Sequence, residues 1–455
     1  MRYNKATEKL PSGKRGDERM KFFLPEAPTR VLWALERAGF PAYLVGGSLR
    51  DCLRGEEPHD WDVTTSALPD RMAAVFDARG MKTIPTGIRH GTITVVVGHV
   101  PVECTTYRVD GAYTDARHPD CVRFTDRISE DLARRDFTVN AMAYRVRQVA
   151  EMDEKDPALS AGLTVDDPTE AGLIDLFGGR DDLENRILRC VGDPQVRFRE
   201  DALRILRGVR FCVGLGLTPD AATAAALASE REGLARISAE RITRELTCML
   251  IGAPSCSPGC RLMDEAALWQ YVLPAIADDP TRTERYTAVD ALPRDAGERL
   301  ACLLCGVGEE RAAQACRALH LSGALTGSVC RGARAITWDF PEDDGALRRR
   351  MASEGDGYEA GARLCAALDR TPGRAAWEDV LSRCEAIRRR GDALRIGDLA
   401  VNGRDVMERF GVRGADVGAL LEWLLSEVLV APEKNCAETL LALARTRLVS
   451  QRGDV

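Results

Sequence analysis

Histidine is scarce in this chain, which has five among its 455 residues. They are His59, His90, His99, His118 and His320. A metal centre or a phosphohydrolase site of the histidine-rich kind needs several imidazoles in one place. The sequence therefore excludes such a site from the chain beyond residue 118, where only one histidine lies.

Long apolar runs are also absent. No run reaches the roughly 18 residues that a membrane-spanning helix needs. The first residues, MRYNKATEKLPSGKRGDERMK, lack the apolar core of a signal peptide. We therefore expect neither secretion nor membrane association.

Lysine supplies only seven of the 63 basic side chains, and 70 acidic residues outnumber them to give a net charge of −7. This balance alone argues against a general polyanion binder. Arginine makes up the rest of the basic side chains, and its planar guanidinium binds two oxygens at once. Clusters of arginine are thus the places where phosphate binding is to be sought.

The 15 cysteines are scattered without regular spacing, mostly inside apolar stretches. An odd, irregular set of this kind is typical of reduced, buried thiols. We therefore expect a cytoplasmic protein without disulfides.

The composition changes along the chain. Residues 1–26 are polar and predict a flexible N-terminus, and the next third mixes helix and strand patterns. From about residue 193 the sequence is rich in Ala, Leu, Arg and Glu and predicts helices, so a domain boundary is expected near residue 190. The patterns predict a helix over 28–39, a short strand in AYLVGG, two strands around a turn within 92–108, and an acidic surface loop over 149–170.

Asp60-Trp61-Asp62 is the first candidate site. In an extended chain, residues i and i+2 point to the same side, so Asp60 and Asp62 would place two carboxylates together. Oxygen ligands of this kind suit Mg²⁺, which completes its shell with water and substrate phosphates. Glu103, on a predicted neighbouring strand, is either a third acid of this site or an exposed strand residue.

Just upstream, LVGGSLRD places two glycines between a predicted strand and a helix. Such a turn lets backbone N–H groups approach a phosphate, and the helix N-terminus adds positive charge. Gly47 and Arg50 are therefore candidates for phosphate binding. The alternative is a tight turn that needs glycine for steric reasons only.

Two further arginine-rich stretches follow. Arg134-Arg135-Asp136 precedes an apolar segment and has the alternative reading of a salt-bridged helix N-terminus. On one continuous helix, Asp201, Arg204, Arg207 and Arg210 would form a slanting stripe. That stripe is either a solvated face or a nucleotide site, with the base near the aspartate and the phosphates near the arginines.

The motifs, taken together, resemble the class II tRNA nucleotidyltransferase/poly(A) polymerase family. The resemblance covers about residues 40–250 and rests on LVGGSLRD, HDWDVTTSALPD, TGIRHGT, VECTTYR, DLARRDFTVNAMAY, LIDLFGGRDDLENRILR, RFREDALRILRGVRF and ISAERITREL, in that order. The remainder resembles more weakly the helical body and tail of bacterial CCA-adding enzymes. The acidic segment 149–170 is longer than in the family, and the single His320 rules out the phosphohydrolase domain that some relatives carry.

The resemblance implies an elongated protein with an α/β head, a polymerase-β-like mixed sheet with helices, followed by an all-helical neck, body and tail. The implied boundaries are a flexible N-terminus over 1–26, the catalytic nucleotidyltransferase head over 27–192, the base-recognising neck over 193–255, the body over 256–390 and the tRNA-binding tail over 391–455.

The resemblance also assigns roles to residues. Asp60 and Asp62 would bind Mg²⁺ for in-line attack of an RNA 3′-hydroxyl on the α-phosphate, without a covalent enzyme intermediate. Glu103, from its place on the predicted neighbouring strand, is expected as the third catalytic acid. The implied nucleotide-binding residues are Gly47, Arg50, Arg135, Asp201, Arg204, Arg207 and Arg210.

Base selection follows from hydrogen-bonding chemistry at Asp201 and Arg204. Cytosine and adenine both present an amino donor beside a ring-nitrogen acceptor, whereas uracil and guanine present the reverse order. A carboxylate accepts from the amino group and a guanidinium donates to the ring nitrogen. This pair would accept CTP and ATP and reject UTP and GTP without a template.

We therefore expect a cytoplasmic enzyme that adds C, C and A to tRNA 3′ ends from CTP and ATP, with no membrane and no obligate protein partner. The alternatives within the family are a poly(A) polymerase and a partial enzyme that adds only CC or only A. An inactive RNA-binding module is the alternative of another class.

Overall fold

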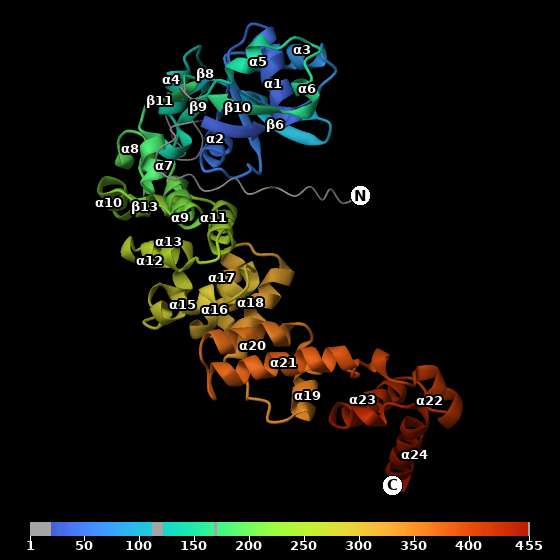
Figure 1. Ribbon diagram of the computed structural model, residues 1–455. Coiled ribbons are helices and arrows are strands. Elements are labelled where there is room, and N and C mark those ends of the chain that lie inside the picture. The colour runs from blue at the N-terminus through green and yellow to red at the C-terminus, as the bar shows by residue number, and fades with distance from the viewer. Residues whose placement is uncertain (1–19, 112–121, 168–170, 454–455) are drawn as a thin grey trace. The chain divides into compact units, whose positions relative to one another are not determined.

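The computed structural model describes residues 20–111, 122–167 and 171–453, and the chain forms two compact units (Figure 1). The first unit extends to Ser238 and includes Glu265–Leu268. The second comprises Ala239–Asp264 and the chain from Trp269 onward. A helix long and apolar enough to cross a membrane was not found among the described residues.

A seven-stranded mixed sheet forms the centre of the first unit. Its strands, in sheet order, are β11 (Leu173–Asp175), β9 (Met142–Tyr144), β2 (Ala42–Val45), β3 (Trp61–Thr65), β6 (Val100–Thr106), β5 (Thr92–Val97) and β4 (Lys82–Gly87). Only β3 and β6 run parallel, and the other neighbours are antiparallel. The β5–β6 hairpin confirms the two strands predicted within 92–108.

Smaller elements surround this sheet. The two-stranded pairs are β1 (Met20–Leu24) with β10 (Leu163–Asp167), β7 (Arg108–Asp110) with β8 (Val122–Phe124), and β12 (Ile187–Leu188) with β13 (Thr218–Pro219). The helices are α1 (Glu26–Arg37), α2 (Gly46–Leu53), α3 (Pro69–Asp77), α4 (Ile128–Ala133), α5 (Arg147–Glu151), α6 (Ala158–Ala161), α7 (Gly179–Glu184), α8 (Pro194–Glu200), α9 (Leu203–Leu215) and α10 (Ala221–Ser229).

Helix α1 confirms the helix predicted over 28–39. Its apolar residues face the sheet and join one core with Leu44, Val63 and Val95. The indole of Trp33 donates a hydrogen bond of 3.2 Å to the carbonyl of Met152. This contact ties α1 to the chain that follows α5, so the sheet and its covering helices form one core.

The sequence reading was wrong at two places in this unit. Residues 20–24 of the predicted flexible N-terminus form β1, and part of the predicted acidic loop forms β10, its antiparallel partner. The physical reason is that inward and outward side chains alternate along these strands. Phe22 and Leu24 on β1 and Val165 on β10 are the inward ones and are buried. The charged neighbours of these residues obscured the strand pattern. Residues 1–19 and 168–170 lie outside the described residues.

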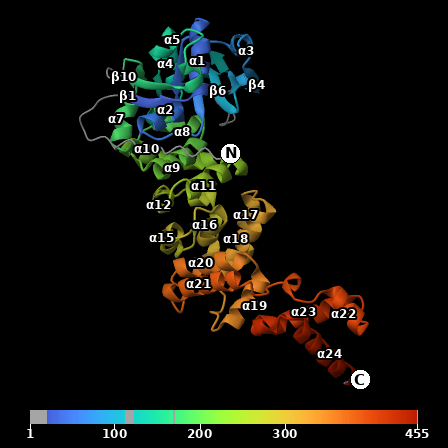
Figure 2. The same ribbon diagram turned by 45° about the vertical axis from the view of Figure 1, so that its right-hand side comes forward.

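The second unit confirms the predicted helical character, and no strand occurs in its described part. Its helices are α11 (Ala239–Ile251), α12 (Ser257–Glu265), α13 (Trp269–Val272), α14 (Pro274–Ala277), α15 (Arg285–Asp290), α16 (Ala296–Leu304), α17 (Glu309–Ala318), α18 (Gly323–Ala335), α19 (Asp344–Glu354), α20 (Gly357–Ala367), α21 (Arg374–Arg390), α22 (Gly403–Phe410), α23 (Ala415–Val430) and α24 (Ala437–Gly453). They are visible from a second side in Figure 2.

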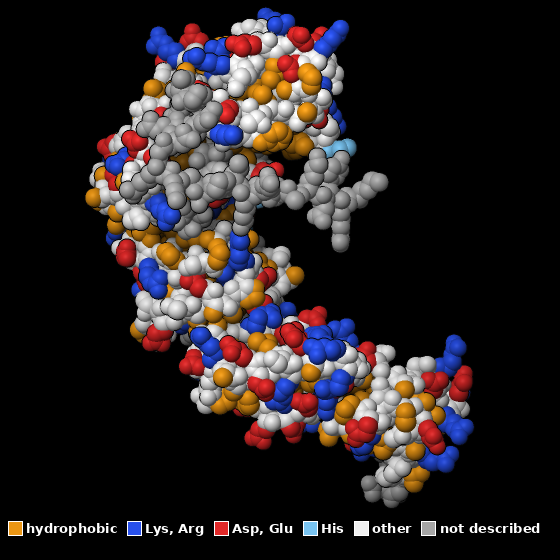
Figure 3. Space-filling view, in the orientation of Figure 1, with side chains coloured by type: hydrophobic (Ala, Val, Ile, Leu, Met, Phe, Trp, Pro, Cys, Tyr) orange, Lys and Arg blue, Asp and Glu red, His pale blue; other side chains and the backbone are white. Residues whose placement is uncertain are grey.

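Two separate hydrophobic clusters hold the C-terminal helices together. One includes Leu347, Tyr358 and Trp377 of α19, α20 and α21, and another lies within residues 393–444. On the face of these helices shown in Figure 3, basic and acidic side chains are interspersed. This mixture agrees with the small net charge of −7.

The cysteines of the described chain form no disulfide, and most are buried, as predicted. Cys302 and Cys305 have the CxxC spacing that also occurs in redox and metal motifs. Both thiols are buried, and burial raises the pKa of Cys305 to about 11 and that of Cys302 well above its usual value. Because thiolates are the reactive form, this pair is a packing element of α16 and its C-terminal turn.

Candidate active site

Two acids of the site lie on neighbouring parallel strands. Asp62 of β3 is the register partner of Glu103 of β6, so their side chains leave the sheet side by side. Asp60 directly precedes β3. Gly46 closes the site from the β2–α2 turn, where its φ of +65° favours glycine and an added Cβ would lie 3.5 Å from Asp62 Oδ2.

The electrostatics of this group suit a cation. Burial, then the charges of Glu103 and Asp60, raise the pKa of Asp62 to about 6, although Arg135 and Arg50 oppose the shift. A carboxylate held among like charges is stabilised when a metal ion neutralises it.

Among the described residues, no group of three or more His, Cys, Asp or Glu side chains is arranged to hold a metal ion by itself. A carboxylate pair with open positions is what Mg²⁺ uses beside substrate phosphates. Asp62 and Glu103 on neighbouring strands, with Asp60 directly before β3, supply carboxylate oxygens of the kind that a hard divalent cation takes.

Helix α2 brings Gly47 and Arg50 to the same turn. Arg50 is only 8% exposed. Its Nη1 donates to Asn140 Oδ1 at 2.7 Å, and its Nε donates to Asp51 Oδ1 at 2.9 Å. A Cβ on Gly47 would lie in ordinary contact with Arg50 Nη2, at 3.5 Å, so Gly47 borders the guanidinium.

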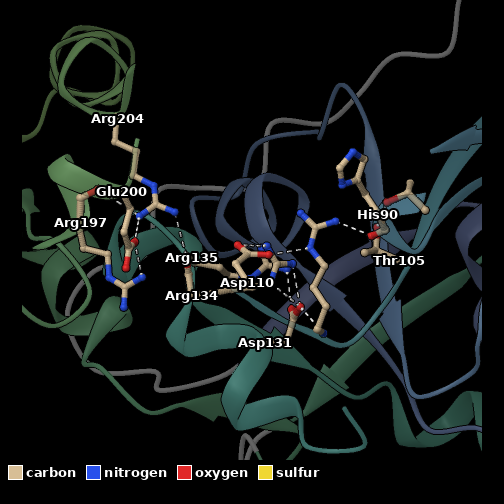
Figure 4. Close-up of polar contacts among 11 residues, drawn as sticks. His90, Thr105, Asp110, Asp131, Arg134, Arg135, Arg197, Glu200 and Arg204 are labelled. Atoms are coloured by element: carbon tan, nitrogen blue, oxygen red, sulfur yellow. Dashed lines mark hydrogen bonds and ion pairs between the residues drawn. The ribbon is translucent and has the colours of Figure 1, made fainter. Parts of the chain in front are cut away.

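Arg135 also lines this turn. An added Cβ on Gly46 would lie 3.1 Å from Arg135 Nη1, and that nitrogen donates to the Asn140 carbonyl at 3.3 Å. Buried Asp131 accepts from Arg134 Nη2 at 2.7 Å and from Arg135 Nη2 at 3.3 Å (Figure 4). The two arginines follow the C-terminal end of α4, which corrects the alternative reading of a helix N-terminus.

The predicted stripe of Asp201 and three arginines on one helix is wrong in one respect. Helix α8 ends at Glu200, Asp201 is extended with φ −145° and ψ 102°, and α9 begins at Leu203. Asp201 Oδ1 accepts from the Leu203 N–H at 3.0 Å. Because a short polar side chain satisfies a free N–H at a helix start, the aspartate favours this break.

The arginines of α9 are nevertheless held in place. Arg204 Nη1 donates to Glu200 Oε2 at 2.6 Å, and Arg204 Nη2 donates to the Arg134 carbonyl at 3.3 Å. Figure 4 shows Glu200 between Arg197 and Arg204. The hydrogen bond from Arg204 to the Arg134 carbonyl links α9 to the chain after α4.

Arg207 Nε and Nη2 both donate to Asp136 Oδ2, at 2.8 and 2.6 Å. The guanidinium carbon of Arg210 lies 4.3 Å from the centroid of the Phe211 ring. The predicted stripe is thus divided. Asp201 lies in the break between α8 and α9, and the three arginines lie on α9.

Sequence reasoning missed Asn140, Asp136 and Phe211 as parts of this site. Asn140 Nδ2 donates to Asp136 Oδ1 at 3.4 Å while its Oδ1 accepts from Arg50. The two residues therefore join Arg50 to Arg207. Their spacing of four residues beside Arg135 was a signal in the sequence, but their partners on α2 and α9 are distant along the chain.

The pair of Asp136 and Arg207 gives a pH-dependent stability. Burial alone would raise the pKa of Asp136, but the charge and hydrogen bonds of Arg207, with Arg204, lower it to about 2, below its ordinary 3.8. A carboxyl with a lowered native pKa stabilises the fold above its unfolded pKa and loses this effect as the pH falls. Asp136→Asn should therefore unfold more easily than the parent at pH 5, by about 2 kcal/mol, with the gap closing between pH 4 and 2.

Urea unfolding at several pH values measures this gap, and Asp126→Asn, which alters an exposed carboxylate, is the control. A gap that stays constant down to pH 2 would contradict the assignment of the lowered pKa.

Residues 42–189 match the family described as "Poly A polymerase head domain", and residues 216–279 match "Probable RNA and SrmB-binding site of polymerase A". These ranges contain the acids of β3 and β6 and the start of the helical chain after α9.

Two curated relatives are CCA-adding enzymes. The protein from Levilactobacillus brevis is 42% identical over 259 residues, which are 57% of this chain and 58% of that protein. The protein from Geobacillus stearothermophilus is 35% identical over 388 residues, which are 84% of this chain and 86% of that protein. The chain thus spans little more than half of the first protein's length and most of the second's.

Solved structures agree in fold. The Bacillus stearothermophilus CCA-adding enzyme in complex with CTP aligns over 94% of this chain and 98% of its own, with 30% identity and a TM-score of 0.72. The Thermotoga maritima CCA-adding enzyme complexed with tRNA, 20% identical, aligns over 92% of this chain and 95% of its own with a TM-score of 0.64 and shows the shared fold alone. From the extent of the match to the Geobacillus protein, the chain belongs to the CCA-adding enzyme family of nucleotidyltransferases.

Proposed function

We propose that this chain is a template-independent tRNA nucleotidyltransferase that adds C, C and A to the tRNA 3′ end from CTP and ATP. One observation carries the proposal: a Cβ added at Gly46 would lie 3.5 Å from Asp62 Oδ2 and 3.1 Å from Arg135 Nη1, so both side chains line the same turn. A carboxylate for a metal ion and a guanidinium for a phosphate are thereby within reach of the same group. The relative from Bacillus stearothermophilus was crystallised with CTP.

Enzymes of this family use a divalent metal ion. We propose Mg²⁺ here, held by Asp60 and Asp62 with Glu103 beside them as the third catalytic acid. When bound, the ion supplies charge neutralisation for the triphosphate and activation of the RNA 3′-hydroxyl.

The chain's own side chains orient the nucleotide. Gly47 and Arg50 at the start of α2, with Arg135, receive the triphosphate, and Arg207 and Arg210 extend this positive surface. The charge that develops at the α-phosphate would then meet fixed positive charges instead of water, and such electrostatic stabilisation is a main source of catalysis in phosphoryl transfer.

Base recognition falls to Asp201 and Arg204. The carboxylate accepts from the amino group of cytosine or adenine, and the guanidinium donates to the adjacent ring nitrogen. Glu200, which accepts from Arg204 Nη1 at 2.6 Å, fixes the guanidinium in one orientation.

The remaining assignments follow the same proposal. Residues 27–192 act as the catalytic head, 193–255 as the neck that recognises the base, 256–390 as the body and 391–455 as the tail that binds tRNA. The separate hydrophobic cluster within 393–444 supports an independent tail. A cytoplasmic location is proposed from the free thiols of the described chain.

The decisive experiment uses a tRNA transcript that lacks its last three nucleotides. With CTP, ATP and Mg²⁺ together, we expect three additions, two C and one A, and then a halt. With CTP alone the reaction should stop after two additions, and a transcript that already ends in CCA should accept none. A long A tail would identify a poly(A) polymerase, and CC or A alone a partial enzyme.

A further inference from the structure

Phe211 of α9 is surrounded by three guanidinium groups. The guanidinium carbons of Arg210, Arg207 and Arg50 lie 4.3, 5.4 and 5.6 Å from the centroid of its ring. Arg207 and Arg210 belong to α9, as Phe211 does, whereas Arg50 belongs to α2. The ring is 7% exposed, so it lies beneath the cations and not in the solvent.

Three like charges around one side chain need a compensating attraction. Arg207 has the carboxylate of Asp136, and Arg50 has that of Asp51 at 2.8 Å. Phe211 adds the negative face of its ring, which attracts cations within about 6 Å, most strongly where water is excluded.

A second buried ring packs against Phe211. Phe137, which is fully buried, meets Phe211 in an edge-to-face contact with 5.8 Å between centroids and an interplanar angle of 83°. Phe137 lies directly after Asp136, the partner of Arg207. Within the described part of the chain, Phe137 itself has no guanidinium contact.

We propose that Phe211 is a positioning residue that gathers Arg50, Arg207 and Arg210 for the triphosphate of the incoming nucleotide. It acts through the arginines and does not touch the nucleotide. The inference rests on the proposed function, because the triphosphate is the group that these cations would bind.

The proposal separates phosphate binding from base selection. Loss of the ring should weaken binding of any triphosphate by a similar factor, whatever its base, because the arginines spread apart. The preference for CTP and ATP over UTP and GTP, which falls to Asp201, should be unchanged.

The test compares full-length variants with and without the ring. Phe211→Leu and Phe211→Met remove the ring while keeping an apolar side chain of similar volume. Phe211→Tyr keeps the ring, and Phe137→Leu is the matched control that removes an adjacent buried ring. Affinities for inorganic tripolyphosphate, CTP and ATP are measured by titration calorimetry, with thermal melts to confirm folding.

We expect Phe211→Leu and Phe211→Met to bind all three probes about tenfold more weakly than the parent. Phe211→Tyr and Phe137→Leu should stay within about twofold, since each keeps the Phe211 position aromatic. In steady-state kinetics, the loss should fall on KM for CTP and ATP more than on kcat.

If Phe211→Leu and Phe137→Leu lose the same affinity for the three probes, Phe211 is only a packing residue and the inference is overturned. Unchanged affinity in both Phe211→Leu and Phe211→Met would also overturn it. If the parent protein incorporates CTP and ATP into tRNA while either result is found, the proposed function stands and the inference alone fails. If the parent incorporates neither nucleotide, the proposed function fails and the inference falls with it.

Discussion

Asp62→Asn is expected to lower the rate of nucleotide incorporation by at least about 1000-fold and, at the same time, to raise the melting temperature of the metal-free protein. The rate falls because an amide is a poorer ligand than a carboxylate for a hard cation. The stability rises because the Asp62 carboxylate is buried beside Glu103 and Asp60, which disfavour its charge.

The two effects are measured separately. Single-turnover incorporation of CTP gives the rate, and thermal melts in EDTA give a rise of roughly 2–4 °C for each kcal/mol of repulsion relieved. Addition of Mg²⁺ should stabilise the parent and leave the variant nearly unchanged. Asp70→Asn, which alters an exposed acid in the first turn of α3, should alter neither property. Activity near that of the parent would remove Asp62 from the metal site.

Asp201→Ala is expected to reduce the discrimination between CTP or ATP and UTP or GTP by about 10- to 100-fold. In the parent, a wrong base leaves the Asp201 carboxylate and the Arg204 guanidinium facing groups of the same hydrogen-bonding kind. Without the carboxylate, half of this penalty disappears, so UTP and GTP gain relative to the correct nucleotides.

The control for this variant must allow for the helix start. Asp201 Oδ1 accepts from the Leu203 N–H at 3.0 Å, so the alanine also removes a hydrogen bond at the start of α9 worth about 1 kcal/mol. Asp193→Ala removes a similar hydrogen bond at the start of α8, where the aspartate is the N-cap and accepts from the Gln195 N–H at 2.8 Å. This second variant should lose similar stability and keep the discrimination. Incorporation of each nucleotide alone into truncated tRNA measures the ratio, and a ratio equal to that of the parent would exclude Asp201 as the base reader.

Local patterns predicted those parts of the fold that depend on neighbours in the sequence. The β5–β6 hairpin was evident because β-branched residues flank a Gly-His turn, and α1 because its apolar residues recur at helical spacing. Pairing between distant segments was not evident. Nothing near Phe22 indicates that β1 pairs with β10, about 140 residues further on, and the acids around Val165 suggested a loop.

The candidate site shows the same division. The spacing of Asp60 and Asp62 was enough to predict that they act together. The placement of Glu103 beside Asp62, in contrast, depends on the parallel register between β3 and β6. The break at Asp201 was missed because the apolar periodicity continues across it, and the preference of one aspartate for a helix start decided the backbone there. Phe211 was missed because one of its cation partners comes from α2.

The carboxylates that hold the arginines have a consequence for the entropy of binding. Arg50, Arg135, Arg204 and Arg207 are each bonded to an acid within the folded chain, to Asp51, Asp131, Glu200 and Asp136 respectively. Fixing a free arginine side chain costs up to about 2 kcal/mol of conformational entropy. Here that loss is incurred once, during folding, and under the proposed function it is not repeated for each nucleotide that binds. Because these acids hold the arginines in place before binding, more of the interaction energy with a triphosphate contributes to affinity.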